Sequence, residues 1–351
     1  MTHMPSGNFS GASTGSSDVA KMPSLFPLVA GLSLALLVLA GLSLTLGKVD
    51  VPLLEALRGV FDKDPPLATI LLVEIRLPRT ILAVLVGGTL GLCGAALQGL
   101  LRNPLAAPGL IGVSSSAALG AVLMLYFGLA QSFPLALPIG GICGALFVVF
   151  LIYGLAGRDA SVLTLILAGV AISSFAAALT SLALNLAPSP YAAYEIVFWL
   201  LGSLADRSFD HVALVAPLMA VGWLMLLGTG RALDALSLGE ETAATMGFHL
   251  TRVRFAVIVG TALSVGAAVS VTGGIAFVGL VVPHLLRPLV GHQPSRLLGV
   301  SALGGAVLLL VGDIAVRVLS PGLELKLGVL TAIIGAPFFL YLILKTRGEM
   351  R

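Results

Sequence analysis

The sequence predicts an all-α polytopic membrane protein with about ten transmembrane helices, on the evidence of its composition, its glycine content and its apolar runs. Of the 351 residues, 58% are hydrophobic and only 10% are charged, whereas a soluble domain carries roughly 25% charged residues. So few charges cannot cover a water-soluble globule of this length, and lipid must be the solvent for most of the surface. The 42 glycines agree, because membrane helices approach one another over small residues.

Ten uncharged runs are long enough to cross a bilayer. A hydrocarbon core about 30 Å thick needs roughly 20 apolar residues in a helix. The boundary between the seventh and eighth runs is the least distinct, because Gly273-Gly274 alone must make the turn. The ten runs are 25–47, 80–101, 111–130, 134–156, 160–187, 211–230, 253–273, 274–290, 297–318 and 327–344.

The polar segments complete the expected domain organisation. Residues 1–24 are rich in Ser and Gly and are expected to form a disordered cytoplasmic tail, followed by a single transmembrane domain over 25–347. The expected outer loops are 48–79 and 188–210, the latter with a short amphipathic run at Ala193–Leu204, and the longest inner loop is 231–252.

The distribution of Lys and Arg indicates the orientation. An even number of spans puts both termini on one side of the membrane. With that side cytoplasmic, 11 of the 19 lysines and arginines lie inside and 8 lie outside, which follows the positive-inside rule. We expect a multi-pass protein of the bacterial inner membrane with both termini in the cytoplasm.

The sequence lacks the motifs that several classes of function require. The sequence contains no G-x-x-x-x-G-K-[ST] phosphate loop, no G-x-S-x-G elbow and no H-E-x-x-H helix. Ion-coupled carriers usually hold ionisable groups near the midplane, but the only acidic residue inside a span, Asp313, lies near its outer end. A net charge of +3 is too small to suggest nucleic acid. We therefore expect an external energy source and no catalytic residue, metal or cofactor on this chain.

The inner loop contains a helix-like segment at Ala235–Gly247. Leu238, Ala243 and Met246 fall at helical spacing, and Gly247 breaks the pattern. A short helix with apolar and acidic sides suits a groove on a soluble partner. The alternative is an interfacial helix on lipid, but such helices usually carry Lys and Arg on the polar face. The residues predicted to dock this partner are Leu238, Gly239, Glu240, Ala243, Met246 and Gly247.

Three arginines mark the outer side of the second and ninth spans. Arg76 and Arg79 precede the second span, and Arg317 ends the ninth. Arginine suits bidentate pairing with carboxylates, so these three residues are predicted to meet a partner protein outside the membrane. Anchoring of helix ends at lipid headgroups is the alternative. Asp313 lies four residues before Arg317 on the same helix face, and would neutralise part of its charge.

A break in the chain follows the second span on the inner side. Pro104 cannot continue a helix, and it biases Asn103 away from the helical region. Broken backbone at membrane depth is tolerated where it is buried in protein or lines a cavity. Asn103, Pro104 and Leu105 are therefore a candidate inner gate, with a plain loop as the alternative.

Other residues carry weaker signals. Cys93 and Cys143 lie in apolar runs and are read as packing residues rather than a disulfide or metal ligands. His284 and His292 flank a Gly291 break, and their spacing matches no known ligand geometry. The patterns Gly87-x-x-x-Gly91 and Gly140-x-x-x-Gly144 predict close helix contacts.

Five stretches, in this order, resemble the BtuC-like family of importer permeases, whose members carry iron–siderophore complexes, haem or vitamin B12. Together they reach over nearly all of the chain after residue 70. They are Arg76-Leu-Pro-Arg79, Gln98-Gly-Leu-Leu-Arg-Asn-Pro-Leu-Ala106, Leu238-Gly-Glu-Glu-Thr-Ala-Ala-Thr-Met-Gly247, Gly274-Ile-Ala-Phe-Val-Gly-Leu-Val-Val-Pro-His284 and Glu324-Leu-Lys-Leu-Gly-Val-Leu-Thr-Ala-Ile-Ile-Gly-Ala-Pro337.

The resemblance implies a type II ABC importer bundle that forms a homodimer around a central path. A separate ATPase, which would hold ATP and Mg²⁺, would dock at the 237–250 segment, and a periplasmic binding protein would dock at Arg76, Arg79 and Arg317. The family's gate falls on Asn103 and Leu105 and on Ser161-Val162-Leu163, where this chain is more apolar than a relative. It also carries Lys326 at a position that is often uncharged in the family.

Several alternatives remain open at this stage. The cargo, and pairing with a paralogue instead of a second copy, cannot be read from the residues. An ion-coupled secondary transporter is the main rival function, and an intramembrane enzyme is a more distant one.

Overall fold

The chain folds into a bundle of long, roughly aligned helices, shown by a computed structural model that describes residues 24–47, 49, 52–62, 64–156, 161–319 and 325–349. The described residues contain no strand. The expected disordered tail therefore lies almost wholly outside the described residues. The helices are α1 (Phe26–Thr45), α2 (Leu53–Arg58), η1 (Gly59–Phe61), α3 (Leu67–Ile70), η2 (Leu71–Arg76), α4 (Leu77–Leu100), η3 (Pro108–Ile111), α5 (Val113–Tyr126), η4 (Leu129–Gln131), α6 (Ala136–Ala156), α7 (Val162–Asn185), α8 (Pro190–Leu200), α9 (Phe209–Leu227), α10 (Gly230–Leu236), α11 (Glu240–Thr245), α12 (Leu250–Thr272), α13 (Val278–Leu286), η5 (Pro288–Val290), α14 (Pro294–Leu319) and α15 (Leu327–Glu349).

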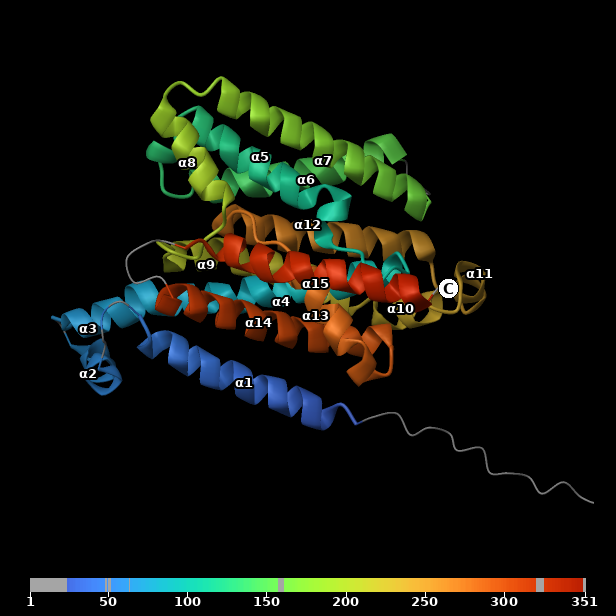
Figure 1. Ribbon diagram of the computed structural model, residues 1–351, viewed down its shortest axis with the longest axis horizontal. Coiled ribbons are helices and arrows are strands. Elements are labelled where there is room, and N and C mark those ends of the chain that lie inside the picture. Colours follow the sequence, from blue (N-terminus) through green and yellow to red (C-terminus); the bar gives the residue numbers. More distant parts are fainter. Residues whose placement is uncertain are drawn as a thin grey trace, which may run out of the picture.

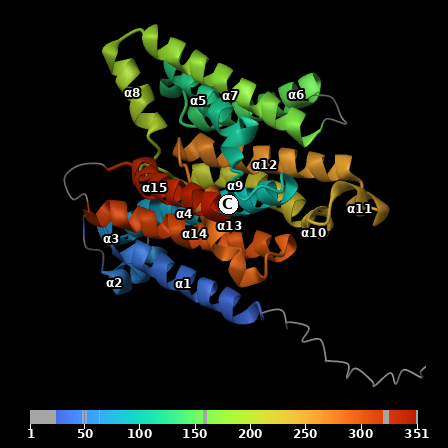
Figure 2. The same cartoon turned by 45° about the vertical axis from the view of Figure 1, so that its right-hand side comes forward.

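Two helices, α4 and α12, form the interior of the bundle. We compare the most apolar 18-residue stretch of each long helix. In the run from α3 to α4, 83% of this stretch is buried, and in α12 78% is buried, whereas in α1 the share is only 6%. Figures 1 and 2 show α1 at one edge beside α14, and α5, α6 and α7 beyond α12 on the other side. The short helices α2 and α3 lie at one end of the bundle and α11 at the other, which we call the α2 end and the α11 end (Figure 1).

Glycines let neighbouring helices meet backbone to backbone. A Cβ atom on Gly87 would lie 2.3 Å from the carbonyl oxygen of Gly305 in α14, and one on Gly91 would lie 2.0 Å from that of Ser301. Gly144 of α6 would meet the Ser116 carbonyl of α5 at 2.1 Å in the same way. Both predicted Gly-x-x-x-Gly contacts are thus confirmed, and no larger residue fits these positions without separating the helices.

Every predicted span contains a helix, and eight of these helices are long and apolar enough to cross a membrane. The other two are shorter. The third, α5, has 14 residues, and the eighth, α13, has nine, which is about 14 Å of helix. Gly273 turns out of α12 with φ +70°, and the chain stays non-helical until Val278, so the run 274–290 is not one continuous span.

Two loops differ from their predicted form. The outer loop expected at 48–79 ends at Leu67, where one continuous helical run begins and reaches Leu100. This helix continues through Arg76 and Arg79 because both guanidinium groups find partners inside the protein. The amphipathic run predicted at Ala193–Leu204 in the second outer loop is helical only as far as Leu200, because α8 runs from Pro190 to Leu200.

Substituting Gly305 with leucine is expected to push α14 away from α4. The new Cβ would start 2.1 Å from the carbonyl oxygen of Gly87, and overpacking of this kind typically costs about 1–3 kcal/mol or more. Gly299 lies in the same helix with no heavy atom within 4 Å of its Cβ position, so G299L is the matched control. Thermal unfolding of the purified protein should show a lower midpoint for G305L alone, and equal midpoints would contradict the packing.

Candidate functional site

At the α2 end, one buried carboxylate binds two of the predicted docking arginines. Asp313 is 0% exposed and accepts hydrogen bonds from Arg79 Nε at 2.9 Å and Arg79 Nη2 at 2.8 Å. Its second oxygen lies 2.9 Å from Arg317 Nη2, as expected from the four-residue spacing. Asp313 therefore joins α4 to α14.

Two of the arginines also hold the end of α1. Arg76 Nη1 donates to the carbonyl oxygens of Leu44 and Thr45 at 2.8 and 2.6 Å. Arg317 Nη1 donates to the carbonyl oxygen of Ser43 at 2.8 Å. Cations at a helix C-terminus satisfy carbonyls that have no partner within the helix. The guanidinium groups of all three arginines thus form hydrogen bonds or ion pairs within the protein. Their contact with a partner protein stays a prediction.

At the α11 end, the predicted docking helix is divided into two. After α10, the chain turns at Gly239, with φ +118°, and α11 then runs only from Glu240 to Thr245. The apolar residues assigned to one face consequently separate. Leu238 and Met246 are exposed at 67% and 57%, whereas Ala243 is completely buried. The single helix expected over Ala235–Gly247 is wrong because a residue with positive φ interrupts it.

Polar contacts attach this segment to two long helices. Glu240 pairs with Arg254 of α12 at 2.9 Å. Asp234 of α10 accepts from the backbone N–H of Ser295 at 2.8 Å and from the Gln293 side chain at 3.1 Å, at the start of α14. An acidic group is favourable at a helix N-terminus. We call the segment Gly230–Gly247 the coupling segment.

The predicted gate residues after α4 form a tight non-helical turn. Asn103 Oδ1 accepts from the N–H of Leu105 at 2.9 Å, and Asn103 and Pro104 are exposed. The chain then enters η3, which packs on α7, where a Cβ on Gly169 would meet the Leu110 carbonyl oxygen at 2.3 Å. We call residues 101–112 the gate loop.

The second predicted gate segment starts α7. Ser161 is the N-cap of this helix, and its hydroxyl accepts from the N–H of Thr164 at 3.1 Å. Val162 and Leu163 form the first turn, and Leu163 is exposed. The contacts between α7 and the gate loop lie further along, at Gly169 and at Ser173, which bonds the Gly109 carbonyl at 3.4 Å.

A buried glutamine connects the gate loop to α13. Gln98 is 1% exposed, and its Oε1 accepts from Arg287 Nη2 at 2.6 Å. Its Nε2 donates, over 3.3–3.4 Å, to the carbonyl oxygens of Leu280 in α13 and Ala106 in the gate loop. Arg287 is half-buried, and this contact supplies a hydrogen-bond acceptor for its guanidinium group.

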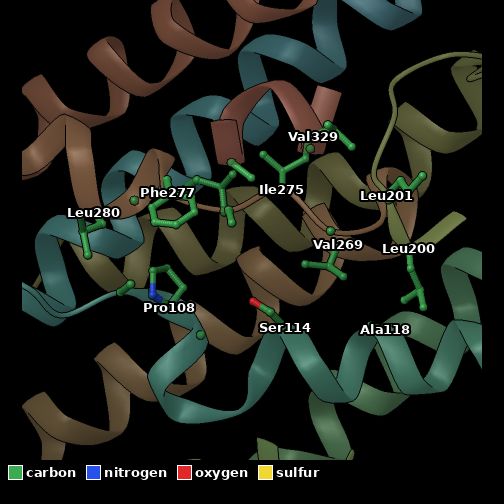
Figure 3. Close-up of a pocket in the computed structure, with 18 residues that line it drawn as sticks. Pro108, Ser114, Ala118, Leu200, Leu201, Val269, Ile275, Phe277, Leu280 and Val329 are labelled. Atoms are coloured by element: carbon green, nitrogen blue, oxygen red, sulfur yellow. The ribbon is translucent and has the colours of Figure 1, made fainter. Parts of the chain in front are cut away.

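An apolar cavity of about 530 Å³ adjoins the gate loop. Figure 3 shows Pro108 and Ser114 beside Phe277 and Leu280, with Leu200 and Leu201 at the opposite end and Val329 of α15 across from α5. Ala106 and Leu280, the residues joined by Gln98, belong to two of the segments that form its wall. The fold therefore places a chamber next to the gate loop at residues 107–109, and the gating role of Asn103, Pro104 and Leu105 stays a prediction.

Sequence reasoning did not identify Gln98, Arg287 or Asp234 as functional residues. Gln98 and Arg287 both lie within or next to the family stretches, which is the one signal that could have marked them. His284 and His292 were weighed as ligands, but the described residues contain no cluster of three or more potential metal ligands. Cys93 is a buried packing residue, and Cys143 is exposed on α6, with both thiols free.

The chain is similar to known transport proteins over most of its length. The FecCD transport family matches residues 35–345. The Fe(3+) dicitrate transport system permease protein FecD of Escherichia coli (strain K12) is 38% identical, with 91% of this chain and 99% of that protein covered. The vitamin B12 import system permease protein BtuC of Vibrio vulnificus (strain CMCP6) is 37% identical, with 89% and 92% covered.

A solved structure shares the fold. It is a transporter assigned to the metal-chelate ABC type, in an inward-facing conformation, with TM-score 0.81 and 34% identity over 91% of this chain and 99% of that one. The multi-helix bundle and these relatives define a membrane-spanning permease subunit of an ABC importer. The chain belongs to the FecCD transport family, as the five stretches indicated.

Replacing Asp313 with asparagine is expected to destabilise the protein. Arg79 and Arg317 would lose their shared counter-charge, and removing one partner of a buried pair typically costs about 3–5 kcal/mol. Glu74 is exposed at the same end, so E74Q is the control. The thermal midpoint of D313N should fall well below that of E74Q, and a D313N midpoint equal to wild type would show that the pairing contributes nothing.

Replacing Gln98 with leucine is expected to slow transport about tenfold, which corresponds to about 1.4 kcal/mol. The substitution removes three hydrogen bonds and leaves Arg287 without its acceptor. Q98E keeps an acceptor for Arg287 and should be intermediate, and Q131L, at an exposed glutamine, is the control. Uptake in proteoliposomes at equal protein content measures the effect. Wild-type uptake by Q98L would exclude Gln98 from gating.

Proposed function

We propose that this chain forms, as a homodimer, the path of an ATP-driven importer for a metal chelate or corrinoid. The first candidate cargo is an iron–siderophore complex, followed by haem and cobalamin. Relatives named for Fe(3+) dicitrate and vitamin B12 support this range. ATP and Mg²⁺ would be bound by a separate ATPase, and this chain would bind no cofactor of its own.

One observation in particular supports the proposed docking of the ATPase at the coupling segment. Leu238 and Met246 expose large apolar side chains on either side of α11, in a segment that is otherwise anchored to the bundle. Exposed apolar side chains on a rigid support, next to the acidic Glu241, suit a groove on a soluble partner. The contacts of this segment with α12 and α14 also support the proposal, because a loop without such contacts could not transmit a force to the bundle.

The anchors suggest how movement of the ATPase would reach the gate. A displacement of the coupling segment would act on α12 through the Glu240–Arg254 pair and on α14 through Asp234. The segment between α13 and α14 carries Arg287, which contacts Gln98 and, through it, the gate loop. We infer that the gate loop and the Ser161–Leu163 turn close and open the inner end of the path in response.

Delivery of the cargo is proposed to occur at the α2 end. A periplasmic binding protein would bring carboxylates to the edges of Arg79 and Arg317, whose side chains remain 18% and 10% exposed. This assignment places the α2 end in the periplasm and the α11 end in the cytoplasm. Both termini would then be cytoplasmic, in agreement with the bias of Lys and Arg.

An ion-coupled mechanism is the weaker alternative. Its coupling site would need an ionisable group that can gain and lose its ion within the membrane. The one buried acidic residue of the described spans, Asp313, lies between two arginines near the α2 end. A carboxylate neutralised in this way serves structure rather than ion binding.

Placing a carboxylate on either exposed apolar side chain tests the docking proposal. L238D and M246D should each reduce the amount of ATPase that co-purifies with the permease at least tenfold, because an apolar side chain buried at an interface contributes about 1.5–3 kcal/mol. F127D is the control, since Phe127 is equally exposed at the other end of the bundle.

Two outcomes would contradict these proposals separately. Undiminished ATPase binding by the L238D/M246D double variant would move the docking surface elsewhere while leaving the importer intact. Accumulation of cargo in proteoliposomes that contain this chain and no ATPase would overturn the ATP-driven function itself.

A further inference from the structure

A groove on the outside of the bundle combines an apolar wall with one cationic end. It lies between α6 and α12 near the α11 end, and has a volume of about 570 Å³, within the range of small-molecule sites. Its lining includes Phe150, Tyr153 and Gly154 of α6, and Arg252 and Phe255 of α12. None of these residues belongs to the coupling segment or the gate loop.

The long part of the groove is suited to a hydrocarbon chain. Phe150 and Phe255 are 72% and 49% exposed, and the rings of Tyr153 and Phe255 lie 5.6 Å apart between centroids. A Cβ atom on Gly154 would have no heavy atom within 4 Å, so this glycine leaves space rather than filling a helix contact. Both helices are long and apolar enough to span a membrane, and a groove on their outer side would then face acyl chains.

Two polar groups at this groove, the Arg252 guanidinium and the Tyr153 hydroxyl, lack partners within the described part of the chain. Arg252 is exposed at the start of α12 and makes no hydrogen bond or ion pair there, whereas Arg254, two residues further on, pairs with Glu240. The Tyr153 hydroxyl is buried and has no hydrogen-bond partner. A buried hydroxyl without a partner costs about 1–3 kcal/mol, which a ligand oxygen would recover.

We propose that this groove binds one anionic phospholipid. Its phosphate pairs with Arg252, an ester oxygen accepts from the Tyr153 hydroxyl, and an acyl chain lies along Phe150 and Phe255 over Gly154. A cation at the cytoplasmic end of two membrane helices is the arrangement that attracts anionic headgroups. A second protein copy on this face would cover Arg252, and it would then need an acidic residue there. This site depends on the membrane position of α6 and α12, and not on ATPase docking.

Native mass spectrometry of the purified protein tests the site, with phosphatidylglycerol or phosphatidylethanolamine added to the detergent. The wild type should retain one phosphatidylglycerol at collision energies that remove phosphatidylethanolamine. R252Q should reduce retention at least fivefold because it removes the charge. G154L should do the same because its side chain fills the groove while Arg252 remains. R58Q, at an exposed arginine of the α2 end, should retain the lipid as the wild type does.

Three outcomes would overturn the proposal. The first is equal retention of phosphatidylglycerol by the wild type, R252Q and G154L. The second is displacement of the lipid by millimolar glycerol 3-phosphate, which would reduce the site to one for a free phosphate. The third is loss of the homodimer in G154L with lipid retention unchanged, which would assign the groove to a second copy of the chain.

Discussion

Lipid offers no hydrogen bonds, so a charged group inside this bundle needs a partner from the protein itself. Asp313 meets Arg79 and Arg317, the terminal carbonyls of α1 meet Arg76, and Gln98 meets Arg287. An apolar side chain is nearly as stable against lipid as against another helix. Apolar contacts therefore give a helix little preference for one neighbour over another. These few polar contacts therefore determine which helices lie side by side and at what height.

Glycine contacts and polar contacts together determine which helices become neighbours. Gly87 and Gly305 bring α4 and α14 to backbone contact, and the Arg79–Asp313 pair joins the same two helices near one end. A shift of α14 along α4 would break the ion pair and collide at the glycines. The α4–α14 contact is consequently rigid. By contrast, only 22% of the most apolar stretch of α7 and of α15 is buried, so both helices have large surfaces left for other contacts.

The order of the helices and eight of the ten spans could be predicted because the membrane imposes a length on apolar runs, whereas α5 and α13 are shorter than their runs suggested. Helix boundaries could not be predicted so well, since a charged residue ends a span only if it needs water. Arg76 and Arg79 do not need water, so the helix starts at Leu67 rather than after them. The helix predicted for the docking residues is divided in two, because Gly239 takes a backbone conformation that the sequence pattern did not reveal. Gln98 was missed because its partner Arg287 lies 189 residues away in the sequence.

The attachment of α1 has a consequence for biosynthesis. This helix contacts the bundle along α14, and Arg317, which binds the carbonyl of Ser43, follows that serine by 274 residues. While the ribosome is still producing the middle of the protein, α1 has already entered the bilayer without its final neighbour. It must wait there as a separate hydrophobic segment, and nascent chains released before α14 is complete would leave it unattached and open to quality-control proteolysis.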